Sequence, residues 1–290
     1  MIDNYLLQEL VTFAQTGTLA KTADQLMITQ PTVTRGMQKL EDELGVELFV
    51  RQPNRIRLSK TGQLAATEAA KVLAANDNFV TKVKNFAASQ LVTQIAAVAP
   101  GPLMIADQLT KHLSLEINRT FVKPAEVVNT LTNHAATIVF TNQEIQTDTV
   151  ESLFMGSEKL FVNLDQFMFL ANKQSVHFAD LKGFSFVVDN QIGVWKQVID
   201  QEIPDAKFLY QTQRNAMREI TKYSNFPYFS TDITQHIDRP TSDDDDDRVC
   251  IPIDDEEATM DFYAAYLKGR QKDLRPVLQQ FSTQWSRYSN

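Results

Sequence analysis

Residues 30–39 carry side chains of the types that contact the edges of base pairs. They supply amides, hydroxyls, methyl groups and cations, at Gln30, Thr32, Thr34, Arg35, Gln38 and Lys39. In the major groove of DNA, an amide or a guanidinium group can form paired hydrogen bonds with a base, and a methyl group can contact thymine. The alternative is that these side chains only hydrate an exposed helix face. The segment therefore favours nucleic-acid binding, provided that one element presents these side chains together.

Basic residues gather just after this segment. The chain has 290 residues and a net charge of −8, which by itself disfavours binding to a polyanion. However, 18 of the 28 Lys and Arg residues and 27 of the 36 Asp and Glu residues lie in residues 91–290, so the excess acid belongs there. Among the seven basic residues of the first 60, four fall between Arg51 and Lys60. This cluster is suited to contacts with phosphates.

Three predicted helices must position the segment. Apolar residues recur at helical spacing over residues 2–16, and a second short helix follows from Thr18. The third helix begins after Thr29, a favourable N-cap, and ends at Gly45. Its inner stripe is expected to consist of Val33, Met37, Leu40 and Leu44. Two such helices joined by a short turn form a helix-turn-helix, which reads DNA through the first turns of its second helix.

Two further features belong to the same module. Gly36 lies inside the third helix, where glycine costs about 1 kcal/mol relative to alanine, and a close approach of DNA or of another helix would explain it. Beyond the helix, apolar and basic residues alternate around a turn at residues 52–54, which predicts a two-stranded wing. Because a wing can follow the DNA backbone or enter the minor groove, we expect contacts from Arg51 and Arg55.

A long helix is predicted from Thr61 to about Gln90. One series of its residues is spaced alternately four and three positions apart, at Ala65, Ala69, Val72, Asn76, Phe79, Val83 and Phe86. All of these residues are apolar except Asn76. Such a seam must be buried, and a like helix from a second copy of the chain is the simplest partner, although packing on the chain's own domain is the alternative. A buried Asn76 would fix the register of the pair.

The rest of the chain alternates strand-like and helical runs, which predicts an α/β domain. Strands are expected near Lys159–Leu164, Phe184–Val188, Lys207–Tyr210 and Phe262–Leu267, and helices near Gly101–Lys111, Pro124–Thr132, Val194–Gln201, Asn215–Tyr223 and Arg275–Tyr288. Five consecutive aspartates, Asp243 to Asp247, are interpreted as a solvated loop rather than a cation site.

No pattern of a catalytic or metal site is present in the sequence. The four histidines are scattered, and neither a nucleophile turn nor a phosphate-binding glycine loop occurs, so we expect no enzyme activity, metal or cofactor. The single cysteine, Cys250, is interpreted as a packing residue, with a redox sensor as the alternative. The sequence shows neither a membrane-spanning run nor a signal peptide, so a cytoplasmic protein is expected.

The N-terminal motifs are similar to those of a known family. The run from Leu10 to Gly62, in particular LAKTADQLMITQPTVTRGMQKLEDELGVELFVR followed by RLSKTG, resembles the helix-turn-helix of LysR-type transcriptional regulators. The resemblance implies an α/β multidomain protein: a winged helix-turn-helix at 1–60, a linker and dimerisation helix at 61–90, and a regulatory domain at 91–290. It also implies homodimers, often tetramers, and allows contact with RNA polymerase. By matching position, it assigns DNA contacts to Gln30, Pro31, Thr32, Thr34, Arg35, Arg51 and Arg55.

For the regulatory domain, the resemblance implies a periplasmic-binding-protein-like fold with lobes at 91–160 plus 268–290 and at 161–267, crossing near Phe161–Leu164 and Phe262–Leu267. A small-molecule effector, often a carboxylate, is expected between the lobes near helix N-termini, which attract anions. The matching residues are Pro100, Gly101, Pro102, Thr141, Asn142, Asn190, Gly193, Ser230 and Thr231. The Pro-Gly-Pro sequence lacks the hydroxyl that the family often has there, so a different ligand or an unliganded regulator stays open.

The sequence thus predicts a sequence-specific regulator that binds double-stranded DNA and responds to a small molecule. The alternative is a ligand-binding module whose N-terminal domain contacts proteins rather than DNA.

Overall fold

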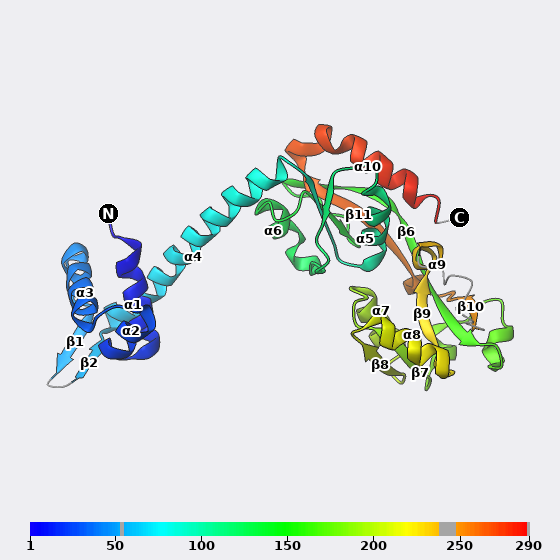
Figure 1. The fold of residues 1–290 in the computed structure, drawn as a ribbon, viewed down its shortest axis with the longest axis horizontal. Coiled ribbons are helices and arrows are strands. Elements are labelled where there is room, and N and C mark those ends of the chain that lie inside the picture. Colours follow the sequence, from blue (N-terminus) through cyan, green and yellow to red (C-terminus); the bar gives the residue numbers. More distant parts are fainter. Residues whose placement is uncertain (53–54, 238–247, 289–290) are drawn as a thin grey trace. The chain divides into compact units, whose positions relative to one another are not determined.

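The computed structural model describes residues 1–52, 55–237 and 248–288, and only the backbone of Arg55 and of residues 214–218 (Figure 1). The predicted loop at Asp243–Asp247 and the tip of the predicted turn, Pro53 and Asn54, lie outside the described residues. The chain divides into two compact units, Met1–Lys84 and Asn85–Asn290, here called unit 1 and unit 2. Each unit is described by itself.

Unit 1 contains the predicted helices and wing. Its elements are α1 (Asn4–Thr16), α2 (Leu19–Leu26), α3 (Gln30–Leu44), β1 (Phe49–Gln52), β2 (Arg55–Leu58) and the first part of α4 (Lys60–Ser89). The Thr18 hydroxyl accepts a hydrogen bond from the Lys21 N–H (3.3 Å), and the Thr29 hydroxyl accepts one from the Thr32 N–H (3.4 Å). These side chains cap α2 and α3, as the residue types at helix starts predict. β1 and β2 pair antiparallel and form the wing.

The core of unit 1 lies where α1, α2 and α3 meet. Its largest buried side chains include Leu6, Leu10, Phe13, Val33, Met37, Leu40 and Leu48. Three of the four residues in the predicted inner stripe of α3 are buried, but the prediction for Leu44 is wrong, since this side chain is 40 % exposed. Leu44 is the last residue of α3, directly before the Gly45 cap, and it is not among the buried residues of the helix.

Gly36 is explained by the approach of α1, not of DNA. A Cβ atom at this position would overlap Oε2 of Glu9, whose side chain is buried against the glycine. Oε2 has no hydrogen-bond partner within the described structure, and desolvation raises the pKa of Glu9 to about 7. Glycine at position 36 therefore leaves room under α3 for a carboxyl group from α1.

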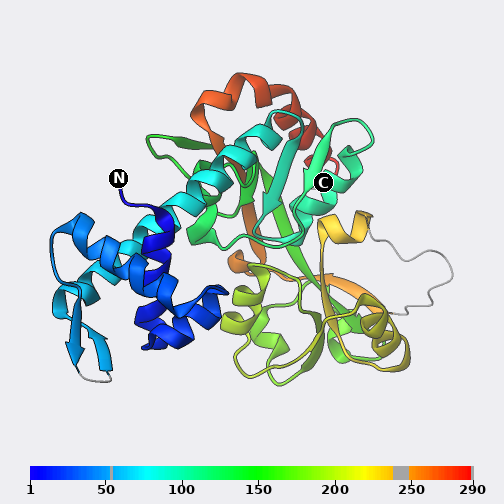
Figure 2. The ribbon, with the colours of Figure 1, turned by 60° about the vertical axis from the view of Figure 1, so that its left-hand side comes forward.

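Unit 2 is an α/β domain with two groups of strands. Around β3 (Thr93–Ala97), lobe 1 collects α5 (Pro100–Leu109), β4 (Leu115–Ile117), α6 (Val127–Thr132), β5 (Ile138–Thr141), β11 (Thr259–Leu267) and α10 (Gln271–Trp285). Lobe 2 collects β7 (Ser185–Asp189), α7 (Trp195–Glu202), β8 (Lys207–Gln211), α8 (Arg214–Tyr223), β9 (Tyr228–Thr231), α9 (Asp232–Ile237) and β10 (Arg248–Pro252). Both views show the α7, α8, β7 and β8 elements as a group beside lobe 1 (Figures 1 and 2).

Short 3₁₀ helices complete the connections, at Pro124–Glu126, Phe169–Asn172, Phe178–Leu181, Glu256–Ala258 and Lys268–Arg270.

One long strand, β6 (Val150–Asp165), joins the lobes. Residues 150–159 pair antiparallel with β11 in lobe 1, and residues 160–165 pair with β9 and β10 in lobe 2. The return to lobe 1 comes earlier than predicted, since β11 pairs with residues 150–159 of β6 along its length and with β5 at Tyr263, Ala264 and Ala265. Residues 259–267 thus belong to lobe 1, although the sequence placed them in the second lobe, because pairing partners rather than local pattern decide to which sheet a strand belongs.

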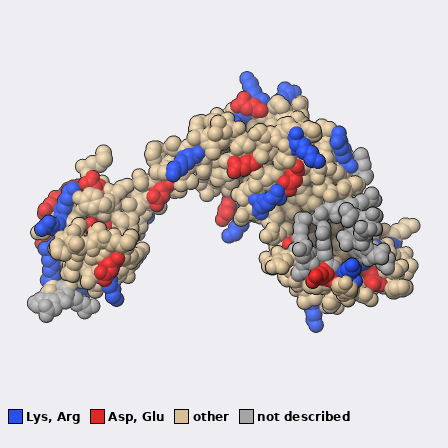
Figure 3. Space-filling model, viewed as in Figure 1, with Lys and Arg blue, Asp and Glu red and all other residues tan. Residues whose placement is uncertain are grey.

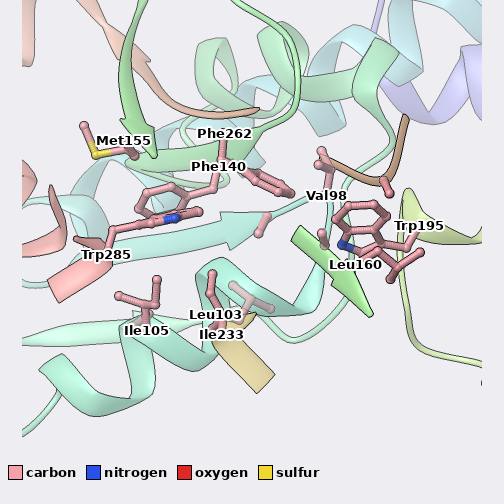
Figure 4. Close-up of a cluster of buried hydrophobic side chains, with 14 of the residues drawn as sticks. Val98, Leu103, Ile105, Phe140, Met155, Leu160, Trp195, Ile233, Phe262 and Trp285 are labelled. Carbon is pink, nitrogen blue, oxygen red and sulfur yellow. The ribbon is translucent and has the colours of Figure 1, made fainter. Parts of the chain in front are cut away.

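A single apolar core runs through both lobes of unit 2. Trp195 from lobe 2 and Trp285 from α10 are both almost completely buried and lie well apart within it (Figure 4). Since both lobes contribute to this core, their contact is part of the hydrophobic stabilisation of the unit.

A double-mutant cycle tests the explanation of Gly36. The Gly36→Ala substitution should fail to stabilise the wild-type chain, because the new methyl group displaces the Glu9 carboxyl. In a Glu9→Ala background the same substitution should stabilise by about 1 kcal/mol, the helix propensity difference. Chemical denaturation of the four chains measures the coupling. Equal effects of Gly36→Ala in both backgrounds would refute the packing explanation.

Candidate nucleic-acid interface and effector site

The outer face of α3 presents the predicted base-reading residues together. Gln30, Pro31, Thr32, Thr34, Arg35, Gln38 and Lys39 are all exposed, opposite the buried stripe. Two hydroxyls are already used, since Thr34 donates to the Gln30 carbonyl (3.0 Å) and the Thr32 and Thr29 hydroxyls lie 2.8 Å apart. Arg35 has no ion-pair partner within the described part of the chain, so its guanidinium group is available to a ligand.

Lys39 differs from Arg35 in its surroundings. Its Nζ lies 3.0 Å from an Asp3 carboxylate oxygen, 3.1 Å from the Tyr5 hydroxyl and 3.7 Å from a Glu43 carboxylate oxygen. The hydrogen bonds with Tyr5 and Asp3 raise the pKa of Lys39 above its ordinary value. This cation is already paired on the unit's own surface, so its contribution to phosphate binding must compete with Asp3.

Glu41 ties the wing to α3. Its Oε1 accepts hydrogen bonds from the backbone N–H groups of Leu48 (2.7 Å) and Phe49 (3.1 Å), and its Oε2 lies 2.7 Å from Nη2 of Arg51. Sequence reasoning missed this residue, because nothing local distinguishes it from the exposed acids Asp42, Glu43 and Glu47. One carboxylate thus sets both the start of β1 and the position of the first wing arginine.

Basic side chains line the edge of unit 1 that carries α3 and the wing, with acidic ones among them (Figure 3). Arg51 and Arg57 on the wing and Arg35 on α3 are exposed. The side chain of Arg55 lies outside the described residues, although its backbone places it opposite Gln52 in the wing.

The predicted seam of α4 divides into two parts. Ala69 is buried and Ala65 partly buried against the core of unit 1, so the chain's own domain covers this end, which is the alternative left open by the sequence. From Val72 onward the seam residues are exposed, including Asn76 and Phe79, which is 66 % exposed. Near the end of α4, the exposed Phe86 ring contacts the ring of His134, which is partly buried.

Between the lobes, the central group is the carboxyl of Glu158 on β6. Its side chain is 0 % exposed. From lobe 2, the Thr231 hydroxyl donates to Oε1 (2.6 Å) and the Trp195 Nε1–H donates to Oε2 (3.3 Å). From lobe 1, Gly101 at the start of α5 lies against the carboxyl, so that a Cβ there would meet Oε1 at 2.5 Å. No local pattern marks Glu158 in the sequence, because it lies in a stretch of ordinary strand residues.

Burial controls the protonation of this junction. Desolvation raises the pKa of Glu158 to about 7, against the lowering effect of the hydrogen bonds from Thr231 and Trp195. The neighbouring Asp232 on α9, whose pKa desolvation raises to about 6, adds like charge. Asp232 is held by the N–H groups of Lys159 (3.2 Å) and Ile233 (2.9 Å). The junction therefore carries two acidic groups that hold their protons more tightly than usual.

The structure gathers only some of the predicted effector residues here. Gly101 and Thr231 meet at Glu158, and Gly193 lies against the Val98 carbonyl, which accepts a hydrogen bond from the Val194 N–H (3.0 Å). Pro100 and Pro102 flank Gly101 in the first turn of α5 and leave few free N–H groups there.

The remaining predicted effector residues lie elsewhere. The Ser230 side chain lies on the opposite face of β9 from Thr231, and its hydroxyl accepts from Asn163 Nδ2 (2.8 Å). Asn190 is exposed on the loop before α7, whereas Thr141 is buried at the end of β5, next to Asn142. An effector contact by any of these residues stays a prediction.

Other candidate chemistries find little support. In the described ranges, no group of three or more His, Cys, Asp and Glu side chains could hold a metal ion, and no helix is both long and apolar enough to cross a membrane. Cys250 lies on β10 in an exposed position rather than in the core, so its interpretation as a packing residue is wrong. Partial desolvation raises the pKa of its thiol, which disfavours the reactive thiolate.

Comparison with protein families gives one match. Residues 5–63 match the model described as bacterial regulatory helix-turn-helix protein, lysR family. The HTH-type transcriptional regulator ClcR of Pseudomonas putida is 27 % identical over 131 residues, or 38 % of this chain and 44 % of the relative. OxyR of Escherichia coli, a DNA-binding transcriptional dual regulator, is 26 % identical over 61 % of this chain and 60 % of the relative. The chain thus spans about half the length of these relatives.

Solved structures support the same fold over nearly the whole chain. DarR of Vibrio fischeri in complex with DNA has a TM-score of 0.55 at 16 % identity, covering 100 % of this chain and 99 % of that one. Full-length OxyR of Pseudomonas aeruginosa has a TM-score of 0.52 at 17 % identity, covering 97 % and 95 %. The predicted architecture of a helix-turn-helix, a long helix and an α/β domain is confirmed.

Stability should depend on pH through Glu158. With its pKa raised from 4.5 to about 7, the folded chain keeps this proton where the unfolded chain has lost it. The resulting stabilisation is complete below about pH 4.5 and is lost as the pH rises through 7. Relative to a Glu158→Gln variant, which cannot ionise, the wild type should lose up to roughly 3 kcal/mol between pH 5 and pH 8. Urea unfolding of both chains measures this, and a constant difference across the range would contradict the assignment.

Proposed function

We propose that this chain, which belongs to the lysR family of bacterial regulatory helix-turn-helix proteins, binds duplex DNA in a sequence-specific manner and regulates transcription. The observation that carries the proposal is the outer face of α3, where an amide, hydroxyls and the unpaired Arg35 guanidinium lie exposed in the first turns. This is the part of a helix-turn-helix that enters the major groove. The family consists of transcriptional regulators, not enzymes.

In this proposal the two arginine positions have different roles. Arg35 and Gln30 on α3 read base edges, because their planar groups suit paired hydrogen bonds. Arg51 contacts the phosphate backbone through the guanidinium N–H groups that its pairing with Glu41 at Nη2 leaves available. Arg55 is assigned the same role from its place on β2. Lys39 contributes less, because Asp3 and Tyr5 already engage it.

We further propose that two copies of the chain pair through the exposed part of the α4 seam. Val72, Phe79 and Val83 are each more than half exposed in one copy, and together with Asn76 they keep heptad spacing. A parallel or antiparallel partner helix would bury them. Pairing would present two copies of α3 to two half-sites, which a single, nearly neutral unit needs for tight binding. Tetramers, RNA polymerase as a contact and a cytoplasmic location belong to the same proposal.

Unit 2 is proposed to regulate this binding through a small molecule. Two lobes joined by β6 and by the segment before β11 can change their contact when a ligand binds between them. The contacts at Glu158 and between Val98 and Val194 are the ones that such a change would alter.

Substitution of the two arginines tests the DNA-binding proposal. Arg35→Ala should weaken binding to a duplex selected from a random library by about 1–3 kcal/mol and spare binding to unrelated DNA. Arg51→Ala should weaken both and lower the slope of log affinity against log salt by about 1. Fluorescence anisotropy over a salt series measures both quantities.

Arg119→Ala serves as the control for these variants. Arg119 is an exposed arginine of unit 2 paired with Asp107, so its loss should leave DNA affinity unchanged. A wild-type chain with no affinity for any duplex would refute the DNA-binding proposal and favour protein contact instead. Equal losses for Arg35→Ala on both kinds of DNA would make Arg35 a backbone contact.

Self-association should depend on one face of α4. Phe79→Asp places a charge in the exposed seam and should weaken pairing by about tenfold or more, since burial of a Phe side chain contributes about 1.5–3 kcal/mol. Thr81→Asp adds the same charge on the opposite, exposed face of α4 and should have little effect. Sedimentation equilibrium measures both. If the two variants associate alike, the seam is not the interface.

A further inference from the structure

A fully buried carboxyl group with no cationic partner is unusual, because burial of a charge requires compensation. Glu158 forms no ion pair within the described residues, and it lies in the middle of unit 2 rather than at its surface. Neither the DNA-binding face nor the hydrophobic core requires a carboxyl group at this position.

Two side chains of lobe 2 provide hydrogen-bond donors to this group. Trp195 comes from α7 and Thr231 from the end of β9, and they are only 2 % and 5 % exposed. The indole N–H points to one carboxyl oxygen (3.3 Å) and the hydroxyl to the other (2.6 Å). Indole nitrogen is only a donor, so this position can satisfy an acceptor and nothing else. Two donors from separate elements that converge on the two oxygens form a subsite for one carboxyl group.

Lobe 1 supplies the space for the group. Gly101 leaves the volume that the carboxyl fills, and any side chain at this position would overlap it. The carboxyl therefore contacts both lobes at once, next to the hydrogen bond from the Val194 N–H to the Val98 carbonyl, which also crosses from lobe 2 to lobe 1.

We propose that the junction is a binding subsite for the carboxyl group of a single small organic acid and that the chain fills it with its own Glu158. The side chain then acts as a tethered ligand that keeps lobes 1 and 2 together and excludes carboxylate compounds from the subsite. This inference deepens the regulatory role proposed above and rests on it. It specifies that the resting regulator needs no carboxylate effector.

Removal of the tethered group should expose the subsite. In Glu158→Ala, the lost atoms leave a space that matches acetate or propionate, still faced by the Trp195 and Thr231 donors. The variant should melt at a lower temperature than wild type in chloride. In acetate or propionate at matched ionic strength and about pH 5, where part of the added acid is protonated, it should regain most of the loss. Acetate should bind the variant at least about tenfold more tightly than it binds wild type. Ethylammonium, of similar size but opposite charge, should not stabilise it.

Glu116→Ala is the matched control, because Glu116 is an exposed glutamate on β4 of the same unit. Acetate should stabilise neither this variant nor the wild type more than chloride does. The proposal is overturned if acetate stabilises Glu158→Ala no more than the control, or if ethylammonium stabilises it equally.

Where Glu158→Ala does not fold in chloride, recovery of folded protein on refolding in acetate is the measurement. Recovery in acetate alone supports the subsite, and failure in both salts counts against it. Thermal unfolding involves no DNA, so a wild type without DNA affinity would refute the proposed function and leave the acetate result intact. If both proposals hold, acetate should also return the DNA affinity of Glu158→Ala toward the wild-type value.

Discussion

A carboxyl group buried without a cation constrains everything that surrounds it. Water cannot solvate Glu158, so hydrogen-bond donors and space must come from fixed positions in the protein. Trp195, Thr231 and Gly101 supply them, and these residues belong to α7, β9 and α5. The strand β6 carries the carboxyl at the place where its pairing partner changes from β11 to β9. The carboxyl group of Glu158 thus contacts residues of both lobes of unit 2.

Unit 1 also uses its acidic residues internally. Glu41 holds the wing through two backbone N–H groups and Arg51, and Glu9 occupies the space that Gly36 leaves under α3. Asp3 engages Lys39 in the same way. Glu41 and Asp3 of this nearly neutral unit therefore interact with backbone N–H groups and basic side chains of the same unit. The exposed Arg35 is left as the cation on α3 that a nucleic acid would meet first.

Local features of the sequence predicted most of the elements. Thr18 and Thr29 cap the helices that they were expected to start, and the alternation around residues 52–54 gave the wing. The α/β alternation also gave most helices and strands of unit 2. The errors concern burial and pairing: Leu44 has the right spacing but stays exposed, and β11 has the right residues but pairs with strands of lobe 1. Spacing and propensity describe one element, whereas burial and pairing need two.

The sequence by itself determined the order of the elements, the capping residues and the exposed face of α3, because these follow from periodicity and side-chain type along a short stretch. Only the tertiary structure decided what Glu9, Glu41 and Glu158 do. Each is a glutamate among many, and its role comes from contact with residues between 7 and 73 positions away. Such contacts depend on how distant elements pack, and in a single sequence no local pattern records them.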